Sequence, residues 1–112
     1  MNEKIQQIVR HIIALIVSGD FLAIVELTRG IRISSEEISR TLSDYGRTIV
    51  MPPENAFEQL NVVEVKGACP RQFSVYMPLW TQQEGRSDLT MELTVKASEN
   101  GMEVELDDIH VL

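Results

Sequence analysis

The stretch from Glu84 to Leu112 constrains the fold more than any other part of the chain. It contains two runs in which apolar and polar residues alternate, and the dipeptide Asn100-Gly101 separates them. Alternation of this kind is typical of strands that bury one face. Asn-Gly favours a two-residue type I′ turn, because both central residues of that turn need positive φ. The sequence therefore predicts an antiparallel hairpin with one buried face and one exposed face.

The two faces of this hairpin differ in polarity. One face of its first strand carries Leu89, Met91, Leu93 and Val95, and the other carries Thr90, Glu92, Thr94 and Lys96. On its second strand the apolar residues change phase between Leu106 and Ile109. A β-bulge at Asp107-Asp108 would return Ile109 to the buried face, since two residues of a bulge oppose one on the partner strand. Counting outward from Asn100-Gly101, we expect these pairs: Val95 with Leu106, Leu93 with Ile109, Met91 with Val111 and Glu92 with His110.

Two shorter strands are predicted upstream of the hairpin. They span Leu60–Lys66 and Phe73–Trp80, and a loop at Gln82–Ser87 leads from the second of them into the hairpin. The second strand contains Pro78, which has no N–H group to donate to a neighbouring strand. We therefore expect the end of that strand to lie at a sheet edge or at a bulge.

Three helices are predicted in the first half of the chain, because apolar residues recur there at three- and four-residue spacing. Their expected N-caps are Asn2, Asp20 and Ser34, and their expected C-terminal stops are Gly19, Gly30 and Gly46. The third start is a capping box: the Ser34 hydroxyl accepts from the amide of Glu37, and the Glu37 carboxylate accepts from the amide of Ser34. The following segment, Arg47–Asn55, has two prolines and no helical period, so we expect a connector.

The order of these elements predicts an α+β fold. Three N-terminal helices, in about residues 2–46, precede a four-stranded antiparallel β-meander in about residues 58–112, with helix 1 packed on one sheet face. A chain of 112 residues, 44% hydrophobic and 24% charged, suits a single globular core. We therefore expect one domain, residues 1–112.

Neither a membrane span nor a secretion signal is expected. The longest apolar run, Ile12–Val17, is far shorter than the roughly 18 residues of a spanning helix. The start of the chain lacks the basic region and the small-residue cleavage site of a secretory signal. The only cysteine, Cys69, cannot form an internal disulfide, which agrees with a reducing compartment. The expected location is the cytoplasm.

The charge is concentrated in the second half of the chain. Residues 1–50 carry six basic and six acidic side chains, whereas residues 51–112 carry four basic and eleven acidic ones, which accounts for the whole net charge of −7. From Glu99 to the end there are five acidic residues and neither lysine nor arginine. Such a surface repels nucleic-acid phosphates and attracts basic proteins. A protein partner is therefore favoured over direct nucleic-acid binding.

The sequence carries no established motif for catalysis, metals or cofactors. Its histidines and cysteine, His11, His110 and Cys69, do not have zinc-site spacing, and glycine-rich phosphate loops and GxSxG are absent. We therefore expect no metal, no cofactor, no catalytic residue and no enzyme activity. The acid/base pair that merits inspection is Glu92 with His110. Two acidic groups brought together could also supply a general acid and a general base.

The acidic residues and two aromatic residues define the candidate partner-binding set: Tyr76, Trp80, Asp88, Glu92, Glu105, Asp107, Asp108 and His110. The acidic residues could instead form an ordinary solvated face that keeps an edge from pairing with other chains. Tyr76 and Trp80 share the outer face of their strand, where exposed aromatics would anchor an interface. A helix packed over them would make them core residues instead.

The wording EGRSDLTMELTV, followed after the turn by MEVELDDIHVL, resembles the C-terminal signature of a family of small bacterial proteins without an assigned function. The resemblance covers the last third of the chain, and its polar positions are Arg86, Asp88, Glu92, Asp107, Asp108 and His110. Small domains of this kind often occur as immunity proteins beside polymorphic toxins, including contact-dependent growth-inhibition systems. The resemblance thus implies an immunity protein that neutralises a cognate toxin, and it supplies no catalytic residues.

Two other functions stay open from the sequence. The first is a small-ligand-binding or enzymatic domain, with Tyr76, Trp80, Glu92 and His110 around a pocket between helices and sheet. The second is a homodimer formed through the exposed sheet. A flat acidic face would favour the immunity protein over the pocket.

Overall fold

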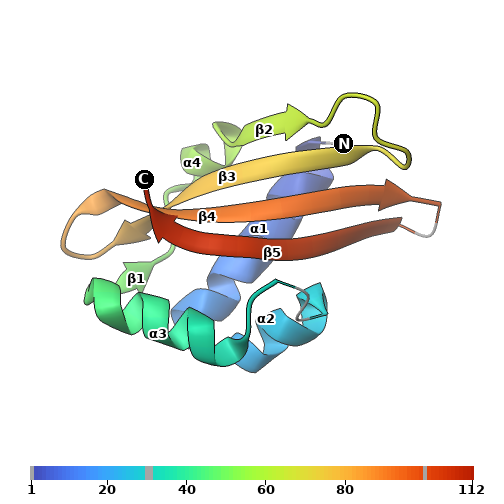
Figure 1. The fold of residues 1–112 in the computed structure, drawn as a ribbon. Helices are drawn as coiled ribbons and strands as arrows, with labels where there is room; N and C mark the ends of the chain where they lie inside the picture. Colours follow the sequence, from blue (N-terminus) through green and yellow to red (C-terminus); the bar gives the residue numbers. More distant parts are fainter. Residues whose placement is uncertain (1, 30–31, 100) are drawn as a thin grey trace.

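The computed structural model describes residues 2–29, 32–99 and 101–112 (Figure 1). Its elements run in this order: α1 (Asn2–Ser18), α2 (Phe21–Thr28), α3 (Ser35–Tyr45), β1 (Ile49–Val50), α4 (Glu54–Glu58), β2 (Asn61–Glu64), β3 (Gln72–Thr81), β4 (Gly85–Ser98) and β5 (Gly101–Val111). Helices therefore precede an antiparallel sheet, and the predicted α+β class is confirmed. In the described ranges, no helix is both long and apolar enough to cross a membrane.

The helix ends follow from local side-chain chemistry. The amide of Glu37 donates to the Ser34 hydroxyl at 3.1 Å, and the amide of Ser34 donates to the Glu37 carboxylate at 3.3 Å, so the predicted capping box is confirmed. Gly46 ends α3 with a φ of 73°. The Asp20 side chain accepts from the amide of Ala23 and caps α2. The predicted stop at Gly30 lies outside the described residues.

The sheet has five strands in the part of the chain that the structure describes. They are ordered β1-β3-β4-β5, and β2 pairs with the same side of β3 as β1, all antiparallel. The prediction that Arg47–Asn55 is only a connector is wrong, because β1 lies within it and α4 begins in it. A two-residue strand and a five-residue helix are too short to produce a detectable period.

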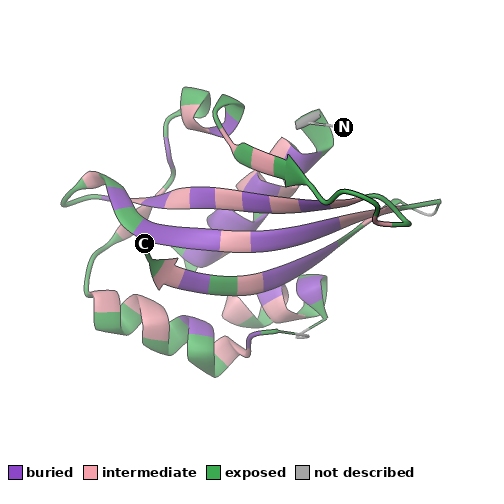
Figure 2. Cartoon of the chain, turned by 45° about the horizontal axis from the view of Figure 1, so that its top comes forward, coloured by how far each residue is buried: buried purple, intermediate pink, exposed green. Residues whose placement is uncertain are grey.

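The core lies between α1 and one face of the sheet. Figure 1 shows α1 crossing behind the strands, with α2 and α3 beside β5. The buried residues of α1 are Ile5, Val9, Ile12, Ile13 and Ile16, and those of β4 are Leu89, Met91, Leu93 and Val95 together with Ser87, Thr90 and Thr94. Buried and more exposed residues alternate along β3, as Figure 2 shows. The remaining face of the sheet, turned away from α1, is called the outer face below.

The predicted bulge is confirmed, but the predicted register is wrong by two residues. Leu93 pairs with Leu106 and Glu92 pairs with Asp108, so Asp107 is the extra residue on β5. Ser98 pairs with Gly101, so Gly101, with a φ of 120°, is the first residue of β5. The expected turn centred on Asn100-Gly101 is therefore displaced by one residue, although Asn100 itself lies outside the described residues.

Pro78 lies where the register of the β3–β4 pair shifts. Pro78 pairs with Thr90, and the next cross-strand pair along β3 is Trp80 with Arg86. Three residues of β4, 87–89, therefore lie opposite the single residue Leu79. On the other side of β3, the pairing with β2 ends at Tyr76 and the pairing with β1 begins at Trp80. Because Pro78 has no N–H group, its place at this break fits the expectation.

Deleting one residue of the Asp107-Asp108 pair should leave the fold intact. The deletion makes β5 regular, because Leu106 can stay opposite Leu93 while Ile109 stays opposite Met91. We expect urea denaturation to give a free energy of unfolding lower by about 1 kcal/mol, which is the order of the lost hydrogen bond between Thr94 and Asp107.

Deletion of Glu105 is the matched control. This deletion shifts either the part of β5 before residue 105 or the part after it by one position relative to β4. The first shift moves Val104 to the outer face, and the second moves Leu106 and Ile109 there. The expected cost is about 2–5 kcal/mol, as for the loss of a large core side chain. Equal losses from the two deletions would show that the bulge does not lie at Asp107.

Candidate protein-binding surface

The outer face has no helix in front of it in the view of Figure 1. Cross-strand pairing arranges its residues in rows: Ser74, Thr94 and Glu105 form one row, Tyr76, Glu92 and Asp108 the next, and Pro78, Thr90 and His110 the third. Thr90 and Thr94 are buried by their larger neighbours rather than by a second layer. Glu92, Asp108 and His110 remain partly exposed, whereas Glu105 is buried.

The central row brings together three predicted site residues from three strands. Glu92 of β4 lies between Tyr76 of β3 and Asp108 of β5. The side chains of Glu92 and Asp108 are 30% and 57% exposed. Two carboxylates directly opposite each other on a sheet repel, so this arrangement does not stabilise the fold. It concentrates negative charge beside an aromatic ring.

His110 adjoins this row but does not face Glu92 directly. It pairs with Thr90, which corrects the predicted pairing of Glu92 with His110. The error comes from the displaced turn, which moves every cross-strand partner of β4 by two residues. His110 Nδ1 nevertheless lies 3.2 Å from Asp108 Oδ2 and 4.0 Å from Glu92 Oε2. The histidine is therefore a neighbour of both carboxylates, and its charge depends on protonation.

A second acidic cluster lies further along β5, at the bulge. Glu105 Oε2 accepts from Lys96 Nζ at 3.3 Å, and Asp107 Oδ2 accepts from the Thr94 hydroxyl at 2.6 Å. Arg32, from the loop between α2 and α3, approaches both carboxylates at 3.7 and 3.8 Å. Arg32 could not be predicted as part of this cluster, because a contact between residues more than 70 positions apart leaves no local pattern in the sequence.

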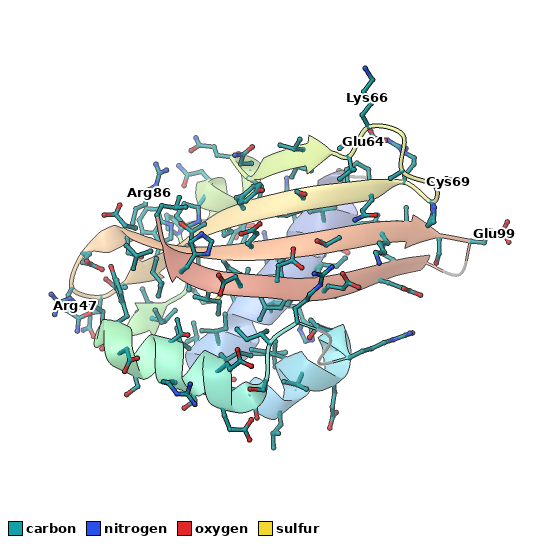
Figure 3. The ribbon with its side chains drawn as sticks, viewed as in Figure 1. Arg47, Glu64, Lys66, Cys69, Arg86 and Glu99 are labelled. Atoms are coloured by element: carbon teal, nitrogen blue, oxygen red, sulfur yellow. The ribbon has the colours of Figure 1, made fainter. Side chains whose placement is uncertain are left out.

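Trp80 and Asp88 stay apart from both clusters. Trp80 is half-buried, with its ring beside Gly85, and it lines a hollow with Ala56 and Gln59 next to α4. Asp88 is exposed, and its carbonyl accepts from the amide of Leu112. Arg86, which belongs to the same sequence signature, lies at the end of β4 opposite to Glu99 (Figure 3). Trp80 pairs with Arg86, beyond the register shift that separates it from the row of Pro78, Thr90 and His110.

Tyr45, the last residue of α3, anchors the loop between β3 and β4. The Tyr45 hydroxyl donates to the Glu84 carboxylate at 2.9 Å, and the Thr81 hydroxyl donates to the same carboxylate at 2.9 Å. Desolvation, followed by this contact with Glu84, raises the pKa of Tyr45 above its ordinary value. The loop is thereby fixed at the end of the sheet where β3 joins β4.

The geometry does not assemble a metal site in the residues that the structure describes, where no three His, Cys, Asp or Glu side chains are grouped suitably. Nor do Tyr76, Trp80, Glu92 and His110 line one cavity. A groove of about 600 Å³ lies elsewhere, between α1, the end of α2 and the first half of β5. We call it the α1–β5 groove. Its apolar lining includes Ile8, Leu27, Met102 and Val104, and its charged lining includes Lys4, Arg29, Glu103 and Glu105.

One protein family matches most of the chain. A family described as a domain of unknown function, DUF7668, matches residues 13–112. The chain belongs to this family. The match includes both acidic clusters and all strands of the sheet, and it begins within α1. No curated protein and no solved structure matches the chain.

Replacing Glu92 by Gln or Asp108 by Asn should stabilise the protein. Each change removes one member of a like-charged cross-strand pair, so we expect the free energy of unfolding to rise by about 0.2–1 kcal/mol. Urea denaturation at low ionic strength measures it. Glu103→Gln is the control, because Glu103 lies opposite Lys96 and its neutralisation should lower the free energy slightly. A loss from Glu92→Gln and from Asp108→Asn would mean that these carboxylates have a structural role.

Proposed function

We propose that this protein is an immunity protein, which binds a cognate bacterial toxin through its outer face and neutralises it. The observation that carries the proposal is the central row, in which Tyr76, Glu92 and Asp108 adjoin on a sheet face without a helix in front of it. Tyrosine is among the residues enriched at interface hot spots, and arginine from a basic partner is another. The repulsion between Glu92 and Asp108 has no evident use for folding, and a basic partner would relieve it.

The charge distribution supports a basic partner. The net charge of −7 comes entirely from residues 51–112, which contain the whole sheet beyond β1. Long-range attraction of this kind speeds the encounter with a positively charged protein and weakens as salt screens it. Toxins that cleave nucleic acids need basic clefts, since their substrate is a polyanion. We therefore propose a basic, nuclease-type toxin as the partner.

The shape of the face also supports a protein partner. A stable protein interface buries roughly 800 Å² on each side, which requires a broad and nearly flat surface. The three rows of the outer face extend over β3, β4 and β5 and do not enclose a cavity. The C-terminal third resembles a family of small bacterial proteins without an assigned function, and small domains of this kind often accompany toxins.

The product of the gene next to this one should co-purify with the protein. We expect Glu92→Lys and Asp108→Lys each to weaken the complex by about tenfold or more, because each puts a positive charge against a basic partner. Isothermal calorimetry or surface plasmon resonance measures the dissociation constant. In the unmodified protein, the association rate constant should fall as the salt concentration rises.

Asp44→Lys is the matched control for these variants. Asp44 is exposed near the end of α3, away from the outer face, and the substitution changes the net charge by the same amount. We expect it to alter the dissociation constant by less than about threefold, since a distant surface charge acts only through screened attraction. Equal weakening by all three variants would refute binding at the central row, and the absence of any complex would refute the proposed function.

The α1–β5 groove supports a second candidate function, the binding of a small ligand. Its volume of about 600 Å³ lies within the range of small-molecule sites, and its lining combines apolar side chains with a few charged ones. A screen of metabolites by thermal shift tests this candidate. A hit whose effect disappears in a Met102→Trp variant, which narrows the groove, would favour it over the toxin.

A further inference from the structure

The carboxylates of Glu105 and Asp107 each accept a side-chain hydrogen bond through only one of their two oxygens. Glu105 Oε2 accepts from Lys96 and Asp107 Oδ2 accepts from Thr94, as described above. The other two oxygens, Glu105 Oε1 and Asp107 Oδ1, are shielded from solvent and accept no hydrogen bond within the described ranges. The Glu105 side chain is only 9% exposed. A buried carboxylate oxygen without a donor is costly, so these two oxygens need an explanation.

Arg32 is the cation next to both orphan oxygens, but it does not satisfy them. Its Nη2 lies 3.7 Å from Glu105 Oε1, and its Nε lies 3.8 Å from Asp107 Oδ1. Both distances exceed those of a hydrogen bond. The Arg32 side chain is 56% exposed, so it stands at the surface above the two carboxylates. The oxygens therefore point to one place where a guanidinium could be bound more closely than Arg32 is.

We propose that Glu105 and Asp107 form a receptor for one arginine side chain of the toxin, and that Arg32 occupies its entrance until that arginine displaces it. This inference rests on the proposed function, and it names the chemistry that the acidic surface recognises. An arginine from the partner offers paired N–H groups to two carboxylate oxygens at hydrogen-bond distance. Lysine fits less well, because its donors do not form a planar fork.

The bulge creates this receptor. Asp107 is the extra residue of β5, and bulges turn side chains away from the regular alternation of a strand. Its carboxylate thereby reaches the same guanidinium as that of Glu105, two positions earlier. Glu105 also lines the α1–β5 groove.

A purely structural role for Arg32 makes the opposite prediction. If the ion pairs of Arg32 only tied the α2–α3 loop to the sheet, replacing Arg32 would loosen the site and weaken any binding there. If Arg32 instead competes with a partner's arginine, its replacement strengthens binding. The effect of Arg32→Ala on the affinity for a guanidinium probe therefore separates the two roles.

The probe is N-acetyl-arginine amide, titrated into the ¹⁵N-labelled full chain and followed by NMR. We expect the largest shifts at the amides of residues 94 and 104–108. Arg32→Ala should tighten the binding about two- to fivefold, the range of a surface ion pair that no longer competes. Glu105→Gln and Asp107→Asn should each weaken it by about tenfold or more. The matched uncharged probe, N-acetyl-citrulline amide, should cause no comparable shifts.

Three results would overturn the inference. The Arg32→Ala variant could bind the arginine probe no more tightly than the unmodified protein, the citrulline probe could cause equal chemical-shift changes, or the changes could spread over unrelated acidic residues such as Glu36. Asp107→Asn keeps the test decisive if Glu105→Gln does not fold. This titration needs no toxin, so its failure differs from failure of the proposed function. If the receptor does not exist but the proposed function holds, the toxin would still form a complex that Glu92→Lys weakens and that changes at Glu105 do not affect.

Discussion

The packing of β4 against α1 is the interaction on which the rest of the structure depends. β4 is an interior strand of the sheet, and its residues Leu89, Met91, Leu93 and Val95 are at most 1% exposed. Burial of each such side chain contributes about 1.5–3 kcal/mol to the free energy of unfolding. The apolar face of β4 therefore determines which face of the sheet packs against α1. A slip by one residue would expose all four. The bulge at Asp107 follows from this constraint, because Leu106 and Ile109 both have to join the same core.

The same constraint leaves the outer face free for another purpose. Because α1 covers only one face, core packing places little constraint on the side chains of the outer face. Those side chains nevertheless form specific arrangements. Glu92 and Asp108 stand opposite each other, and Glu105 and Asp107 each keep one oxygen without a donor. Both features lower the stability of the fold, and natural proteins retain destabilising arrangements at sites where function requires them. A basic partner would relieve both, which links the acidic rows to the receptor at the bulge.

Local chemistry made much of this fold predictable from the sequence. The Ser34–Glu37 capping box, the faces of β4 and the bulge in β5 depend on neighbours in the chain, and all three are correct. The register was wrong because Asn-Gly marks a turn without fixing which residues are central. β1 and α4 are too short to show a period. Arg32 reaches Glu105 through tertiary folding alone, so the bulge cluster could be foreseen as acidic but not as a site with a cation at its entrance.

Hydrogen–deuterium exchange of the protein, free and bound to the product of the neighbouring gene, tests the central claim most directly. Amides of the strands beneath the outer face, in β4 and β5, should exchange more slowly in the complex, together with the described part of the α2–α3 loop around Arg32. The amides of α1 and α3 should exchange as in the free protein. Protection confined to α1, α3 or the α1–β5 groove, with the outer face unchanged, would contradict the claim that the acidic sheet face is the binding surface.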